Sequence, residues 1–465
     1  MTMTGYRSWR FPSILKAVGT SLQPGRLIIG LLVITVLIFG GQVWDAVVPG
    51  TVSPRGLSGG AFTEHALDAQ GQLRRAARRW GESDLSSDAP TPSASQVLAM
   101  LSQAKSSALS EGESDQVKTI DRTMQQINSI RPRGAFEASV AMLGQNLDQF
   151  VQGASRGSPG AIYGAARDTV YGLPAALWNA GQCWFLCIYG LFFMLVIGVC
   201  GGALARMEAC QIAAEERLTM REAMQHALDH WWSFWMALVI PFVLALVVCG
   251  ILLLIGLVGM NLPVLNILTG LLYGLALLVG FLLVFLVLGY AFGSVLLVPA
   301  VAVEHCDGGD AMQRVWAYLL NKPLHMVGYL TVGLIGLALG LLVVDTVALL
   351  TVQWTAEVVG AATFNDVFAE AGRAEAVFGE PAADASAGNA AWSTVWTAGL
   401  VSFWTLLVWY LVAGWIVSYV MAAGTRIYLL MRLASDGQQE QLIWWPGLIP
   451  GTLAEQPNST ASEDQ

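Results

Sequence analysis

The chain has 465 residues, of which 55% are hydrophobic and only 12% are charged. Soluble proteins carry roughly 25% charged residues, so this composition is typical of an integral membrane protein. The formal net charge is −9, from 24 basic and 33 acidic side chains, which gives no basic footprint and excludes nucleic acid as an expected partner.

Six transmembrane helices account for the apolar pattern. The stretch from Phe234 to Val303 contains no Asp, Glu, Lys or Arg, and about 20 apolar residues suffice to cross the ~30 Å hydrocarbon layer as a helix. The fourth apolar run is too long for one span, so we expect it to break, tilt or pass beyond the bilayer near Gly289, Gly293 or Pro299. The predicted spans are 27–48, 182–205, 234–259, 264–293, 326–350 and 395–419.

Charge asymmetry sets the predicted orientation. Arg217, Arg314 and Lys322 fall in connections on the side of the N-terminal leader, whereas the connection 351–394 is predominantly acidic. The positive-inside rule then places both termini in the cytoplasm. The predicted organisation is a leader with the first span (1–48), an extracytoplasmic helical domain (49–168), a membrane domain (169–350), an acidic extracytoplasmic segment (351–394), the sixth span (395–423) and a cytoplasmic tail (424–465).

The extracytoplasmic domain is expected to be helical. Apolar residues recur at helical spacing at Phe136, Val140, Leu143, Leu147 and Val151, without the alternation that a strand requires. The predicted fold class is therefore all-α: a polytopic helical membrane protein with about six transmembrane helices, two interfacial amphipathic helices and a helical extracytoplasmic insertion.

Two parts of the membrane domain share the same order of residues. The second and fourth spans each end near a glutamate, and each is followed by an amphipathic segment with an acidic residue in its first turn. This order predicts an internal parallel repeat with two helices lying in the membrane interface. The residues that mark it are Glu208 and Glu222 in the first copy and Glu304, Asp310 and Arg314 in the second.

Three runs of residues carry a resemblance: Arg206-Met-Glu-Ala-Cys-Gln-Ile-Ala, Pro299-Ala-Val-Ala-Val-Glu304 and Ile427-Tyr-Leu-Leu-Met-Arg432. With them, the spans resemble an uncharacterised family of bacterial multi-pass membrane proteins. More distantly, they are similar to the membrane domain attached to some glycerophosphodiester phosphodiesterases, whose catalytic barrel this chain lacks. The resemblance implies a protein of the bacterial inner membrane and implies no activity.

One group of residues has the spacing of metal ligands. Glu222, His226 and His230 lie four residues apart on one predicted helix, and His305 is expected on the same side of the membrane. Two histidines at i and i+4 with a carboxylate form a permissible transition-metal set. The preferred interpretation is a polar face at the membrane surface, because the repeat places Arg314 opposite His226. The sequence therefore predicts no metal and no cofactor, with the metal site as the alternative.

No catalytic residue is predicted, because the chain has no phosphate-binding loop, nucleophile elbow or paired carboxylates within its spans. The spans also carry no charge near the midplane, which argues against an ion-coupled pump. The favoured function is a non-catalytic scaffold or assembly partner that acts through its extracytoplasmic face, with membrane lipids and another envelope protein as partners. The alternative is a carrier or channel for a lipid or an uncharged small solute, and a membrane enzyme is disfavoured.

Overall fold

The computed structural model describes residues 11–48, 134–215, 217–262, 265–363 and 392–445, with a few short pieces between residues 74 and 124. These residues form helices, and no strand occurs among them. Six helices are long and apolar enough to cross a membrane, which confirms the predicted all-α multi-pass fold. Most of the region 49–133, which was expected to be extracytoplasmic, and all of the acidic segment 364–391 lie outside the described residues.

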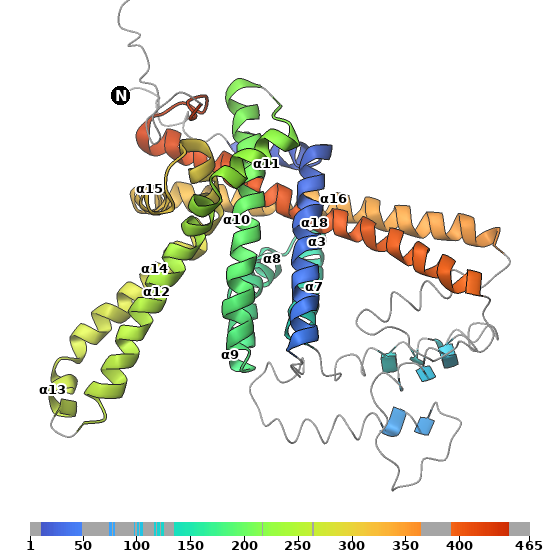
Figure 1. The fold of residues 1–465 in the computed structure, drawn as a ribbon, viewed down its shortest axis with the longest axis horizontal. Coiled ribbons are helices and arrows are strands. Elements are labelled where there is room, and N and C mark those ends of the chain that lie inside the picture. The colour runs from blue at the N-terminus through green and yellow to red at the C-terminus, as the bar shows by residue number, and fades with distance from the viewer. Residues whose placement is uncertain are drawn as a thin grey trace, which may run out of the picture. The chain divides into compact units, whose positions relative to one another are not determined.

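The long helices appear in Figure 1. They are α3 (Pro24–Val47), α10 (Cys183–Ala214), α12 (Trp231–Leu254), α14 (Tyr273–Glu304), α16 (Pro323–Ala361) and α18 (Trp392–Asp436). The shorter elements are α1 (Phe11–Leu15), α2 (Ala17–Thr20), α7 (Ala135–Ser155), α8 (Pro159–Arg167), η3 (Asp168–Gly172), α9 (Leu173–Asn179), α11 (Met220–Asp229), η4 (Ile255–Gly259), α13 (Leu265–Leu271) and α15 (Gly308–Asn321).

The chain divides into two compact units. The first contains Met1–Leu37, Gly190–Leu341 and Leu411–Gln465, and the second contains Ile38–Tyr189 and Leu342–Tyr410. The boundaries fall inside α3, α10, α16 and α18, so each of these helices contributes residues to both units.

The core of the first unit lies where α10, α14 and α18 run together. Small side chains such as Ala203 and Ala300 are fully buried there, beside larger ones such as Tyr428. In a membrane, small residues let helix backbones approach closely, and they take the place of the hydrophobic driving force that lipid cannot supply. One close backbone approach in this unit joins α3 to α18, where a Cβ on Gly30 would overlap the carbonyl of Gly414.

Helices α12 and α14 form a long hairpin closed by η4 and α13 (Figure 1). The apolar segment breaks at Leu272, between α13 and α14, and α14 continues as one helix through Gly289, Gly293 and Pro299. These glycines act as packing positions instead: a Cβ on Gly289 would overlap the indole ring of Trp316 on α15. Of the three outcomes expected near these positions, a break does not occur there, because a glycine that admits a neighbouring side chain does not have to end its helix.

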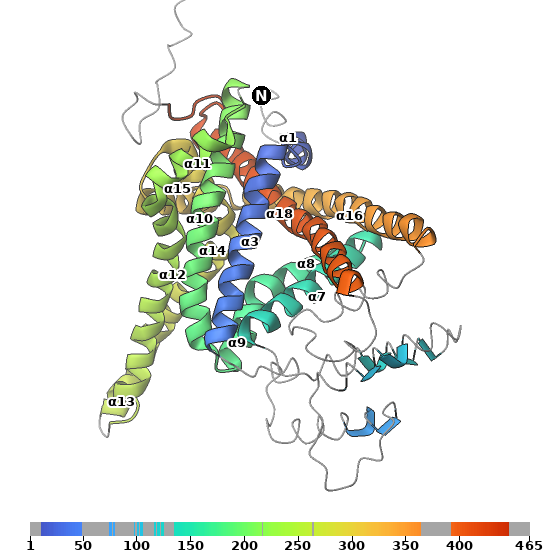
Figure 2. The same cartoon turned by 45° about the vertical axis from the view of Figure 1, so that its right-hand side comes forward.

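In the second unit, α7 and α8 lie side by side (Figure 2). The N-cap residue of α7 is Gly134, which has no side chain to offer, so the carboxylate of Asp45 caps the helix by accepting the backbone N–H groups of Phe136 and Glu137 at 3.0 Å. The predicted helix is confirmed here, although Leu143 and other members of its apolar row are exposed while the opposite face is buried.

Two spans extend well past their predicted ends. Helix α10 continues from 205 to Ala214, and α18 continues from 419 to Asp436. The charge pattern assigned Arg206, Arg426 and Arg432 to cytoplasmic segments beyond the predicted ends of these spans, whereas all three side chains are buried in the first unit. Because their guanidinium groups find partners on neighbouring helices, the helices run on without a break.

Candidate functional site

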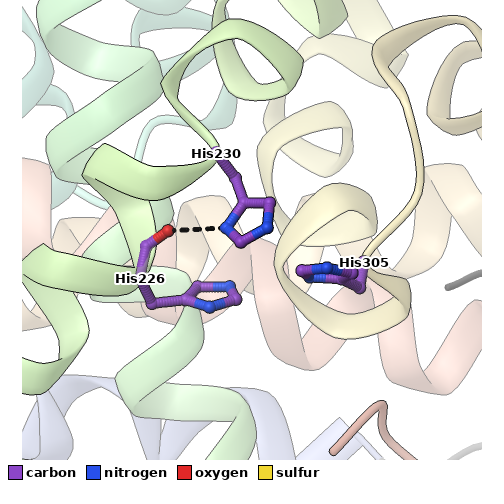
Figure 3. A group of neighbouring side chains, drawn as sticks. All are labelled: His226, His230 and His305. Atoms are coloured by element: carbon purple, nitrogen blue, oxygen red, sulfur yellow. Dashed lines mark hydrogen bonds between the residues drawn. The ribbon is translucent and has the colours of Figure 1, made fainter. Parts of the chain in front are cut away.

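Three histidines from two parts of the chain meet in the first unit. His226 lies on α11, His230 directly follows that helix, and His305 directly follows α14. One ring nitrogen from each lies within 4.8 Å of the others. In Figure 3 the three rings point toward a common space.

The start of α11 is fixed by a capping box. The Thr219 hydroxyl accepts the backbone N–H of Glu222, and the Glu222 carboxylate accepts the backbone N–H of Thr219. The helix ends at Asp229, and His230 is its C-cap residue. Because His226 and His230 are four residues apart, they lie on the same side of the helix. Their ring centroids are 4.9 Å apart.

A backbone bond sets the tautomer of His230. Its Nδ1 lies 2.9 Å from the carbonyl oxygen of His226 (Figure 3). Because a carbonyl only accepts, Nδ1 must carry the proton, and the lone pair of the neutral ring is then on Nε2.

His305 is held by the segment that follows α18. Its ring stacks on Trp444, with centroids 3.7 Å apart and planes 5° apart. The Trp444 backbone N–H donates to the Val303 carbonyl at 2.9 Å, and Arg206 on α10 donates to the carbonyls of Ala302 at 3.0 Å and Trp444 at 2.8 Å. His305 itself has a left-handed backbone with φ of 52°, a conformation that disfavours a residue with a Cβ and recurs at functional sites.

A cavity of about 160 Å³ opens between the three rings. Its walls also include Ser233, Phe234, Val301, Cys306 and Asp307. The space exceeds the roughly 30 Å³ that one water molecule occupies, so the cavity can admit a small ligand or an ion with water.

Burial keeps two of the imidazoles neutral. Desolvation, with help from the Arg206 charge and the neighbouring histidines, lowers the pKa of His226 to about 3. Desolvation likewise lowers the pKa of His305 to about 4, assisted by His230 and Arg206. Desolvation raises the pKa of the Cys306 thiol to about 12, so at neutral pH this thiol stays protonated. The cavity therefore presents nitrogen lone pairs at pH 7, while its sulfur is a poor ligand.

A second polar feature of the first unit is a pair of buried glutamates. Glu208 on α10 is fully buried and pairs with Arg26 on α3 and with Arg426 on α18, the latter at 2.5 Å. The hydroxyl of Thr20 donates to the same carboxylate at 3.2 Å. We call this group the Glu208 cluster.

The matching group, the Glu304 cluster, lies at the end of α14. Glu304 pairs with Arg314 on α15 and with Arg432 on α18, the latter at 3.7 Å. The Tyr428 hydroxyl donates to the Glu304 carboxylate at 2.6 Å. One helix, α18, thus supplies a cation to each glutamate.

The structure places the residues singled out from the sequence as follows. His226 and His230 come together with His305, but Glu222 is exposed and occupied in the capping box of α11. Glu208, Glu304 and Arg314 join the buried clusters, while Asp310 is exposed in the first turn of α15.

Sequence reasoning did not identify the partners of the two glutamates or the role of Trp444. Basic residues at the ends of apolar runs ordinarily face water, and this is where Arg26, Arg426 and Arg432 lie in the sequence. A glutamate at the end of one apolar run and arginines at the ends of others were the available signal, but spacing along the chain does not reveal which of them meet.

We compared the chain with family models, curated proteins and solved structures, and none of them matches it.

Proposed function

We propose that the protein is a non-catalytic scaffold of the bacterial inner membrane, with both termini in the cytoplasm, that assembles with another envelope protein. The observation that carries the proposal is the pair of closed ion clusters at Glu208 and Glu304. They tie α3, α10, α14, α15 and α18 together, so the charges of this core fix helices in place.

Carriers that move charged cargo usually expose an acid, a base or a polar cluster to a path through the membrane. Here Glu208 and Glu304 are at most 1% exposed, and each contacts two arginines. Removing one member of a buried ion pair leaves a charge without compensation, which is strongly unfavourable. These groups are therefore better suited to holding a rigid framework than to exchanging a proton or an ion.

The proposed working surface is the extracytoplasmic region 49–168. In its described part, α7 exposes Val140, Leu143 and Leu147 at helical spacing, with 45%, 41% and 37% of their surfaces accessible. Adjacent exposed apolar side chains on a helix outside the spans favour contact with another protein. A carrier for a lipid or an uncharged solute remains the alternative, because the histidine cavity offers a small polar space.

We also propose that the membrane domain arose by duplication, within the family of bacterial multi-pass proteins that the chain resembles. Two observations support this: Glu208 and Glu304 are both buried near the ends of spans, and each is bound by two arginines. The two amphipathic helices α11 and α15 follow these spans in the same order.

The test is affinity purification of the full-length protein from its native membrane. The triple variant Val140→Ser, Leu143→Ser and Leu147→Ser should insert normally but lose the stoichiometric envelope partner that the unaltered protein retains. The matched control is Gln145→Ser with Gln149→Ser, two exposed polar positions on the same helix, which should retain the partner.

The scaffold proposal fails if both variants retain the same partner. It also fails if the unaltered protein, reconstituted alone in vesicles, moves lipid or solute across the bilayer. In that case the carrier replaces it.

A further inference from the structure

We propose that His226, His230 and His305 bind one divalent transition-metal ion of the zinc class. The inference goes beyond the scaffold function and does not depend on it. Imidazole nitrogen is a preferred ligand of Zn²⁺ and of its neighbours Co²⁺, Ni²⁺ and Cu²⁺. Three such ligands with an open fourth position form a recurrent zinc arrangement.

The present separations are close to what one ion requires. A ligand nitrogen sits about 2.0–2.1 Å from zinc, so two nitrogens of a tetrahedral set are about 3.3–3.4 Å apart. The nitrogens here lie within 4.8 Å of one another. Binding one ion would require the three rings to turn toward one another and close the remaining gap.

The hydrogen-bonding state of the rings suits metal binding. His230 donates from Nδ1 to a backbone carbonyl, the arrangement by which proteins fix the ring of a metal-binding histidine and direct Nε2 to the ion. The Nε2 atom of His226 is buried and has no hydrogen-bond partner among the described residues. A buried nitrogen without a partner is unfavourable, and a metal ion would satisfy it.

The third ligand is held in place on its own account. Trp444 stacks on the His305 ring, and Arg206 holds both the Trp444 carbonyl and the end of α14. These contacts make Trp444 and Arg206 positioning residues. They hold the His305 ring in the cavity even though the left-handed backbone of His305 is energetically unfavourable.

The cavity leaves room for a fourth ligand. Asp307 lines it, and the Ser233 hydroxyl lies 3.5 Å from the Asp307 carboxylate. That carboxylate or a water molecule could complete a tetrahedral set. The charge that opposes a cation is Arg206, whose guanidinium already bonds two carbonyls and lies 5.7 Å from the centre of the Trp444 ring.

The experiment uses full-length protein purified in detergent through a tag that contains no histidine. After chelation and removal of the chelator, Co²⁺ and Zn²⁺ are titrated separately. We expect one ion per chain, a cobalt absorption spectrum typical of four-coordination, and displacement of cobalt by zinc. Substituting any one of His226→Ala, His230→Ala and His305→Ala should weaken binding at least about tenfold.

His325→Ala on α16 is the matched control, because it removes a histidine that is not part of the cluster. It should leave the affinity unchanged. Trp444→Ala should weaken binding and alter the cobalt spectrum, and Trp444→Phe should restore both, since a phenyl ring can still stack on His305.

X-ray absorption of the zinc-loaded, unaltered protein requires no substitution, so misfolding of a variant cannot affect the result. It should show three imidazole ligands. Fewer than three imidazoles in that spectrum, binding of much less than one ion per chain, or equal losses for His305→Ala and His325→Ala would each overturn the proposal.

Discussion

The two ends of α14 have similar apolar compositions but differ strongly in how far their side chains are buried. Near its start, Leu277, Leu278 and Phe281 have 59%, 64% and 70% of their surfaces exposed, whereas Leu296 and Leu297 near its end have 0% and 2%. Both ends are apolar and neither contains a basic residue. Because lipid tails are as apolar as leucine, hydrophobicity alone gives a span no reason to prefer a neighbouring helix to the bilayer.

What distinguishes the buried end is its neighbours. Gly424 on α18 has no side chain and lies against the backbone at Val295, so the two helices approach closely. The Glu304 cluster then fixes their register. At the exposed end, a Cβ added to Gly274 or Gly280 would meet no atom of another described residue outside its own turn of helix within 4 Å. Close approach and polar pairing, rather than apolar content, therefore select the part of this helix that packs.

The largest expected effect follows from removing the charge at the buried end. Glu304→Ala leaves Arg314 and Arg432 without their carboxylate, and breaking a buried pair costs about 3–5 kcal/mol. The free energy of unfolding in mixed detergent micelles should fall by that amount. The control is Glu357→Ala, at an exposed position of α16. An equal, small effect of both substitutions would show that the cluster does not hold the packed end together.

The next prediction compares the loss of a hydrogen bond to a charged acceptor with the loss of one to a neutral acceptor. Tyr428→Phe removes a bond to the Glu304 carboxylate, worth about 1.5–3 kcal/mol, whereas Tyr419→Phe removes a bond to the Gly333 carbonyl, worth about 0.5–1.5 kcal/mol. Both tyrosines are at most 2% exposed, so the pair is matched for burial. The free energy of unfolding in micelles should therefore fall more for Tyr428→Phe than for Tyr419→Phe. The reverse order would mean that general packing, rather than the charged hydrogen bond, determines the stability at these positions.

Close approach can be tested with two glycines. Gly30→Ala places a methyl group against the Gly414 carbonyl, so the helices must separate, at about 1–3 kcal/mol. Among the described residues, the methyl group of Gly280→Ala meets no neighbour beyond its own turn of helix within 4 Å, so this substitution should be neutral or slightly stabilising. Thermal unfolding monitored by tryptophan fluorescence measures both. A destabilising Gly280→Ala would mean that the exposed end of α14 has a packed partner.

The smallest effect is expected at the exposed end itself. Leu278→Ala should change the free energy of unfolding by no more than about 0.5 kcal/mol, the usual range for surface positions. Leu297→Ala near the other end of the same helix should cost about 2–5 kcal/mol, because it leaves a cavity. Comparable losses at both positions would remove the distinction between the two ends.

The sequence was sufficient for the number of spans, because a run of about 20 apolar residues is an unambiguous signal. It was insufficient for the ends of α10 and α18. Arg206, Arg426 and Arg432 look like ordinary boundary residues, and their burial depends on carboxylates and carbonyls supplied by other helices. Which helix faces meet is a property of tertiary packing that helical spacing does not encode.

The histidine site shows the same limit. The spacing of His226 and His230 on one helix was readable, and it suggested Glu222 as their companion. The capping box occupies Glu222, and His305 takes the third place from a distant part of the chain. No pattern in the sequence connects Trp444 with His305, because their stacking depends on how the segment after α18 crosses the end of α14.

The position of α18 as the last of the six spans has a consequence for biosynthesis. Ribosomes deliver helices in chain order, so α3, α10, α14 and α15 enter the membrane while Arg426 and Arg432 are still unmade. During that interval Glu208 has only Arg26 and Glu304 has only Arg314 as cationic partners. When α18 follows, Arg426 and Arg432 complete both groups, so we expect neither glutamate to have its full set of partners before this helix is inserted.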